Sequence, residues 1–119
     1  MNYPKAIGPY SAYRVVGDFI FASGQIPLNP ATNELVNGDI GTQTKQVLEN
    51  IKGILAENGL KFGNVIKTTV FLADIKDFAA MNEVYASYFS EPYPARSAVA
   101  VKDLPKGARV EIEIIAAKS

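Results

Sequence analysis

The chain has 119 residues, 48% of them hydrophobic and 20% charged, which is typical of a single globular domain spanning residues 1–119. Twelve Lys and Arg residues balance twelve Asp and Glu residues, so nucleic acid and anionic membranes are not expected as partners. The absence of Cys and His excludes disulfides, thiol nucleophiles, thiolate metal sites and the usual catalytic base. With no apolar run that approaches a membrane span and no apolar signal peptide, the expected location is the cytoplasm.

The first third of the chain predicts an irregular arm followed by a β-hairpin. Residues 3–12 contain two prolines and one glycine, and they present Tyr10. Two β-rich segments, residues 13–16 and 19–22, flank Gly17-Asp18, a pair that suits a two-residue hairpin turn. Residues 19–22 are continuously apolar, which predicts a strand buried on both faces. Ser23 and Gly24 close this strand, and a glycine there lets another chain or a ligand approach the backbone.

Two amphipathic helices are expected on either side of a central strand. The first is capped by Asp39, ends at Asn58-Gly59 and buries one stripe: Val47, Leu48, Ile51, Ile54 and Leu55. Residues 65–73 are β-branched and aromatic, which indicates a central strand. The second helix begins at Asp74 or Asp77 and is stopped by Pro92. Its apolar stripe consists of Phe78, Met81, Tyr85 and Tyr88 or Phe89, with Asn82 near the edge of the stripe.

The stretch from Pro92 to Val101 carries a single arginine between two prolines and a short apolar strand, residues 98–101. The planar guanidinium of Arg96 matches a carboxylate, which is either an acidic side chain at the start of the strand or the acid group of a ligand. The last strand, residues 108–117, alternates cleanly. It places Val110, Ile112 and Ile114 on one face, and Arg109, Glu111 and Glu113 on the other.

The resulting order, β-β-α-β-α-β-β, predicts an α+β fold. Two crossovers of the same hand put both helices on one face of a mixed sheet, so the other face remains uncovered. An apolar sheet face of this size is expected to be a partner surface, and a second copy of the chain in a closed cyclic oligomer is the economical partner. Two carboxylates on this face would be costly unless they are paired, solvated or used.

Six motifs in this order and spacing closely resemble the RidA/YjgF family of reactive-intermediate deaminases across nearly the whole chain. They are Ile7-Gly8-Pro9-Tyr10-Ser11, Ser23-Gly24-Gln25-Ile26-Pro27, Lys67-Thr68-Thr69-Val70-Phe71, Pro94-Ala95-Arg96-Ser97, Leu104-Pro105-Lys106 and Val110-Glu111-Ile112-Glu113. The resemblance implies a chorismate-mutase-like homotrimer with inward-facing sheets and clefts between subunits. It also implies cofactor-independent hydrolysis of 2-iminobutanoate and 2-iminopropanoate, which pyridoxal-phosphate dehydratases release, to 2-oxo acids and ammonia.

The same resemblance implies roles for individual residues. Arg96 would clamp the substrate carboxylate and Glu111 would activate water. Substrate-binding residues would be Tyr10, Ser23, Gly24, Arg96, Asn82 and Ala98, the last standing where many relatives have cysteine. For Asn82, as for Glu113, Arg109 and Ser11, the preferred interpretation is a structural one: interface pairing, capping or a solvated face.

Two other functions remain compatible with the sequence. One is a non-catalytic trimer that binds small carboxylates and has a regulatory role, because a carboxylate clamp serves binding and catalysis alike. The other is an RNA-directed role in cleavage or translation inhibition, to which some members of the family have been linked. The balanced charge and the lack of an aromatic and basic patch count against RNA.

Overall fold

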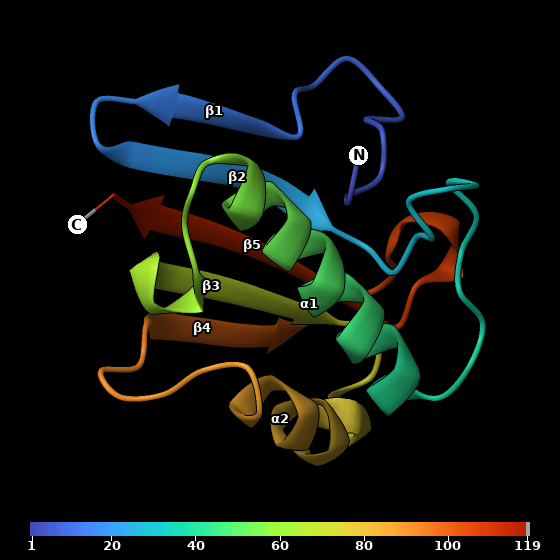
Figure 1. Cartoon of the computed structure of the whole chain (residues 1–119). Coiled ribbons are helices and arrows are strands. Elements are labelled where there is room, and N and C mark those ends of the chain that lie inside the picture. Colours follow the sequence, from blue (N-terminus) through green and yellow to red (C-terminus); the bar gives the residue numbers. More distant parts are fainter. Residues whose placement is uncertain (119) are drawn as a thin grey trace.

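The structure is a computed structural model that describes residues 1–118. In these residues, five strands and two α-helices follow one another in the predicted order. They are β1 (Tyr13–Val16), β2 (Phe19–Gln25), α1 (Ile40–Glu57), β3 (Val65–Leu72), α2 (Phe78–Ala86), β4 (Ala95–Ala100) and β5 (Val110–Ala117). Both helices lie on the same face of the sheet, which confirms the predicted two-layer α+β arrangement (Figure 1).

The sheet is mixed, with strand order β1-β2-β5-β3-β4. The pair β3–β4 is parallel, whereas β1–β2, β2–β5 and β3–β5 are antiparallel. The C-terminal strand β5 is therefore central, and α2 is the crossover between the parallel neighbours β3 and β4. Strand β4 forms one edge of the sheet, and β1 forms the other (Figure 1).

Helix α1 follows its sequence signals at both ends. The Asp39 carboxylate accepts a hydrogen bond from the Thr42 amide at 2.8 Å and so caps the first turn. At the other end Gly59 adopts φ +71°, and the Leu60 amide donates to the Leu55 carbonyl at 2.8 Å. The five residues of the predicted stripe are all buried: Val47, Leu48, Ile51, Ile54 and Leu55.

Helix α2 departs from the prediction at its end. Asp74 caps a short 3-10 turn by accepting from the Lys76 amide at 2.9 Å, and α2 itself begins after Asp77. The helix ends at Ala86, well before Pro92, so proline is not what stops it. Instead, the Ser87 hydroxyl donates to the Val84 carbonyl at 2.6 Å in the last turn.

The core lies between the helices and one face of the sheet. Alternation in β5 is confirmed, because Val110, Ile112 and Ile114 are buried while Glu111 and Glu113 point to the opposite face. Strand β4 differs from the expected buried strand over residues 98–101. It starts at Ala95, and its side chains are mostly exposed because it is an edge strand.

The sheet face without helices, here called the open face, is partly apolar. In register across the strands it presents Arg14, Phe21 and Ile115 in one row, and Glu111, Phe71 and Val99 in another. Only Ile20 and Ala22 of the apolar segment 19–22 are buried, while Phe19 and Phe21 are 45% and 46% exposed. Within one chain the strand is therefore buried on one face only, and the predicted uncovered apolar face is present.

The N-terminal arm is fastened to the helix layer by two tyrosines. The hydroxyls of Tyr3 and Tyr13 both donate to the Glu57 carboxylate near the end of α1. This hydrogen bond, together with burial, raises the pKa of Tyr3 to about 12. Tyr3 is buried against the core, so the arm has a defined path that leads to Tyr10.

Candidate functional site

A bulge in β2 brings Gly24 against Glu111. The register between β2 and β5 shifts between Ala22 and Gln25, so the intervening residues leave the regular ladder. A Cβ atom on Gly24 would lie 2.8 Å from the Glu111 Cδ and would overlap its carboxylate oxygen Oε2. A side chain at position 24 would therefore force the Glu111 carboxylate to move.

Four of the residues predicted for the site line one cavity of about 290 Å³. Its lining consists of Ile7, Tyr10, Ser23, Gly24, Ile26, Pro105 and Glu111. The Ser23 hydroxyl donates to the Ser11 carbonyl at 2.6 Å and thereby holds the arm at the rim of the cavity. Ser11 thus contributes a backbone acceptor, and Tyr10 reaches the cavity from the arm.

Glu111 has the electrostatics of a base. Burial raises the pKa of its carboxyl above the ordinary value, and the negative charge of Glu113 raises it further. Among residues 1–118 the only ion pair joins Arg109 to Asp77, so Glu111 has no cationic partner within its own chain. A half-buried carboxylate with a raised pKa can accept a proton from water near neutral pH.

Arg96 and Asn82 form a second cluster on the opposite side of the sheet. Arg96 donates to the Asn82 side-chain oxygen at 2.6 Å, and its Cζ atom lies 4.8 Å from the ring centroid of Tyr85. An adjacent cavity of about 470 Å³ is lined by Asn82, Tyr85, Ala86, Tyr93, Pro94 and Arg96. The simple alternative of an acidic partner for Arg96 is wrong for the described chain, because its partner is a neutral amide.

The two clusters cannot meet within one chain. Arg96 is the strand partner of Thr68, whose side chain is buried beneath the helices. Glu111 is the strand partner of Phe71 on the open face. Because side chains on paired residues share a face, Arg96 and Glu111 point away from opposite faces of the sheet. Ala98 lies on the face of Arg96 and packs against the core, and it lines neither cavity.

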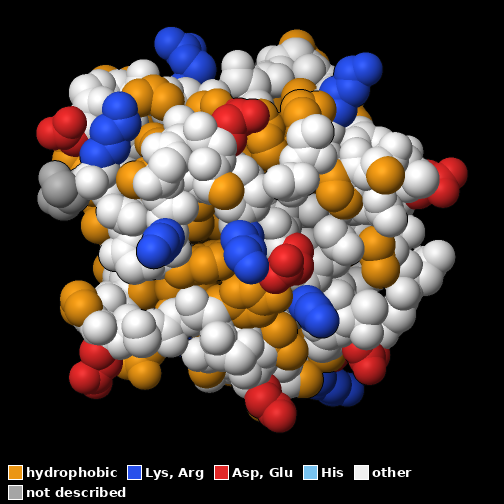
Figure 2. All heavy atoms as spheres, viewed as in Figure 1, with side chains coloured by type: hydrophobic (Ala, Val, Ile, Leu, Met, Phe, Trp, Pro, Cys, Tyr) orange, Lys and Arg blue, Asp and Glu red, His pale blue; other side chains and the backbone are white. Residues whose placement is uncertain are grey.

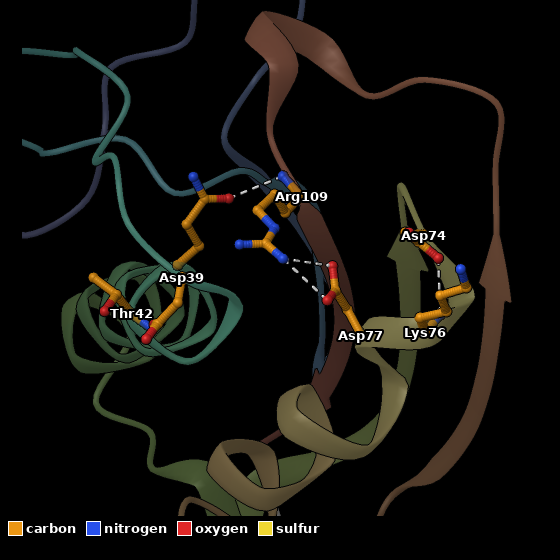
Figure 3. Close-up of polar contacts among 7 residues, drawn as sticks. Asp39, Thr42, Asp74, Lys76, Asp77 and Arg109 are labelled. Atoms are coloured by element: carbon orange, nitrogen blue, oxygen red, sulfur yellow. Dashed lines mark hydrogen bonds and ion pairs between the residues drawn. The ribbon is translucent and has the colours of Figure 1, made fainter.

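The remaining charged residue of the last strand region, Arg109, has a structural partner. Its guanidinium donates to both oxygens of Asp77, at 3.0 and 3.1 Å, and its amide donates to Gln43 Oε1 at 2.9 Å (Figure 3). Arg109 therefore joins the start of β5 to both helices. The Asp39 carboxylate bonds to Thr42 nearby as the cap of α1 (Figure 3).

Sequence reasoning missed the aromatic surroundings of Arg96. Phe78 and Tyr85 were assigned to the buried stripe of the second helix, yet both rings also lie under the guanidinium. Their spacing of seven residues, which puts them on one side of a helix, could have indicated a shared partner. Tyr93, which is 62% exposed, also lines the Arg96 cavity.

Residues 1–118 contain neither a candidate metal-binding cluster nor a helix that could span a membrane. No group of three or more Asp and Glu side chains is arranged to hold a metal ion in this part of the chain. None of the helices described has the length and apolar character to cross a membrane. On the helix-covered face, charged side chains of both signs are scattered and form no continuous basic patch (Figure 2).

Comparisons with known proteins agree with the motif resemblance. The family model described as endoribonuclease L-PSP matches residues 1–118. A RutC family protein of Pyrococcus horikoshii is 58% identical over 117 residues, which cover 98% of this chain and 93% of the relative. The human 2-iminobutanoate/2-iminopropanoate deaminase is 50% identical over 113 residues, which cover 95% of this chain and 82% of the relative.

A solved structure has the same fold as this chain. RidA from the Antarctic bacterium Psychrobacter superposes with a TM-score of 0.93 at 46% identity, and the match covers 98% of this chain and 94% of that one. The mixed five-stranded sheet with two helices on one face is thus the chorismate-mutase-like fold of these proteins. The chain therefore belongs to the endoribonuclease L-PSP family, the RidA/YjgF family that its motifs resemble.

Proposed function

We propose that the protein hydrolyses reactive 2-imino acids and their enamine tautomers, such as 2-iminobutanoate and 2-iminopropanoate, to 2-oxo acids and ammonia. The name of the human relative, which is 50% identical, supports this reaction. So does the chemistry of the two clusters. One has an arginine that pairs with no carboxylate of residues 1–118, and the other has a glutamate with a raised pKa. The substrates are the unstable products that pyridoxal-phosphate dehydratases release, and the reaction needs no cofactor.

In the proposed mechanism Arg96 binds the substrate carboxylate and Glu111 acts as the base. Glu111 takes a proton from water while the water oxygen bonds to C2 of the protonated imine, and the C=N π electrons move to nitrogen. Glu111 then gives this proton to the amino nitrogen. The C–N bond breaks, ammonia leaves with the bonding electrons, and loss of the hydroxyl proton forms the 2-oxo acid. Ser23, Gly24 and Tyr10 form the wall that positions the water and substrate.

The observation that carries the proposal is the separation of Arg96 and Glu111 on opposite faces of one sheet. A site that uses both residues must take them from two subunits. We therefore propose a homotrimer whose open faces point inward, so that Phe19 and Phe21 become buried. Each cleft would combine Arg96 and Asn82 of one subunit with Tyr10, Gly24 and Glu111 of its neighbour.

The proposal is tested by coupling a threonine dehydratase to the protein and measuring the formation of 2-oxobutanoate. The Arg96→Lys and Glu111→Gln variants should each be inactive alone. After unfolding and refolding together in equal amounts, about one quarter of the clefts should contain both native residues and regain activity. A mixture that stays inactive would show that both residues serve from the same subunit, and a wild-type protein without turnover would refute the deaminase.

Two alternative functions, a non-catalytic binder and an RNA-directed protein, can be tested with the same purified protein. A non-catalytic binder with a regulatory role would bind 2-oxobutanoate in a calorimeter but would leave the dehydratase reaction unchanged. An RNA-directed activity, which the family name endoribonuclease L-PSP suggests, would cleave RNA in the absence of the dehydratase. Balanced charge argues against RNA, since binding to phosphates depends on an excess of Lys and Arg.

A further inference from the structure

Among residues 1–118, the groups that hold Arg96 in place are uncharged. One of its five N–H donors bonds to Asn82, and its Cζ atom lies 4.8 Å from the Tyr85 ring centroid and 5.4 Å from that of Phe78. Within residues 1–118 no carboxylate forms an ion pair with it. An aromatic face attracts a cation without occupying its donors, so the remaining N–H groups stay free for an anionic ligand.

The ring of Tyr85 is itself fixed by a buried hydrogen bond. Its hydroxyl lies 2.8 Å from the Thr68 hydroxyl, and both residues are buried. The Phe89 ring packs beside it, with the two centroids 4.5 Å apart. Thr68 is also the strand partner of Arg96. Thr68 therefore both anchors the Tyr85 ring beneath the guanidinium and lies beside the backbone of the arginine. The ring cannot swing away from Arg96 about χ1 without breaking this buried bond.

We propose that Tyr85, fixed by Thr68, is a positioning residue that holds the Arg96 guanidinium in the orientation in which it binds the substrate carboxylate. The proposal rests on the proposed function and adds a residue that touches Arg96 instead of the reacting atoms. A carboxylate in the place of the ring would hold the guanidinium equally well, but it would neutralise the charge and compete with the substrate. The aromatic face avoids that competition.

The chain offers a matched control for this role. Tyr85 and Phe89 belong to the same buried aromatic cluster, but only the ring of Tyr85 lies against Arg96. Tyr85→Leu and Phe89→Leu both remove a ring from the core, and both should lower the melting temperature. A double variant, Thr68→Val with Tyr85→Phe, removes the two hydroxyls together and keeps the aromatic face under the guanidinium.

A first measurement needs no ligand. The sequence contains three arginines, Arg14, Arg96 and Arg109, so their side-chain Nε–Hε groups give three signals in an NMR spectrum. Tyr85→Leu should lower the order parameter of the Arg96 signal, whereas Phe89→Leu should leave it unchanged. Arg109, which is paired with Asp77, serves as the internal reference in both variants.

A second measurement separates binding from chemistry. Tyr85→Leu should weaken 2-oxobutanoate binding in the calorimeter, and raise KM for the imine, by about tenfold, with little change in kcat. Phe89→Leu should bind within about twofold of the wild-type protein. The double variant keeps the ring but loses the bond to Thr68 that fixes it, so it should bind more weakly than the wild-type protein and more tightly than Tyr85→Leu. The acidic limb of the pH profile, which reports Glu111, should not move in any of them.

The outcomes separate this proposal from the proposed function. If Tyr85→Leu matches Phe89→Leu in both the NMR signal and the affinity, Tyr85 is a core residue and the proposal is overturned. If the wild-type protein neither binds 2-oxobutanoate nor converts the imine, the proposed function fails, and the order parameter of Arg96 alone decides whether Tyr85 holds it. Should Tyr85→Leu not fold, Tyr85→Met, which removes the ring but fills more of its space, gives the same test.

Discussion

Replacing Gly24 with alanine should displace the proposed base without disturbing the fold. The added Cβ atom would lie 2.8 Å from Cδ and 3.0 Å from Cγ of Glu111. Non-bonded carbon atoms prefer about 3.5–4.0 Å, so the carboxylate has to retreat by about 1 Å. A shift of about this size costs on the order of 100-fold in rate, which lies within the contribution of about 100- to 10,000-fold expected of a general base.

The assay compares Gly24→Ala with a glycine that has room for a side chain. A Cβ atom on Gly63 would meet nothing within 4 Å, so Gly63→Ala should keep the wild-type rate of 2-oxobutanoate formation. The melting temperature of Gly24→Ala should change little, because the atoms that must move belong to the end of one side chain.

A double variant identifies the target of the Gly24 substitution. If the alanine acts by moving Glu111, it should slow Glu111→Gln no further, since effects on one shared group are not additive. Wild-type turnover of Gly24→Ala would refute the reasoning. An additional loss of about 100-fold on top of Glu111→Gln would show that Gly24 acts through something else.

Further predictions concern the clamp, the two carboxylates and the open face. Arg96→Lys keeps the charge but loses the planar fork, so turnover should collapse while the melting temperature stays constant. Glu111→Gln should abolish turnover. At pH values above the raised pKa of Glu111, the same variant should have a higher melting temperature than the wild-type protein, because there the buried carboxylate is ionised and destabilises the fold. Wild-type activity should fall as the pH drops through that pKa, and Glu113→Gln should move the fall to lower pH by removing a negative charge. Phe21→Lys should convert the proposed trimer to monomers in sedimentation equilibrium, and a variant that stays trimeric would exclude the open face from the interface.

Local patterns in the sequence predicted the elements that depend on local chemistry. The ends of α1 follow from Asp39 and Gly59, each of which satisfies backbone groups of its own helix. Alternation in β5 predicted which side chains are buried. The predicted end of α2 was wrong. Pro92 prevents a helix from continuing through its position but does not prevent it from ending earlier, and the Ser87 hydroxyl closes the last turn before the proline.

The candidate site could be predicted only in part, because its geometry depends on strand pairing. The motifs singled out Arg96 and Glu111, but no local pattern reveals that they project from opposite faces. That depends on the parallel register between β3 and β4, in which Arg96 pairs with Thr68. The same register decides that Tyr85 lies beneath Arg96. Burial of the predicted strand at residues 98–101 was overestimated because an apolar run does not reveal that its strand is at an edge.

The attachment of the arm has a practical consequence for anyone who makes the protein. Met1 is 73% exposed, so a purification tag joined ahead of it leaves the contacts of the arm intact. Tyr3, by contrast, is buried and bonded to Glu57, and it anchors the segment that carries Tyr10 to its cavity. Trimming the first three residues would release that segment from α1. A truncated preparation would keep the whole sheet and both helices, but fewer contacts would hold Tyr10 at the cavity beside Glu111, among them the hydrogen bond from Ser23 to the Ser11 carbonyl.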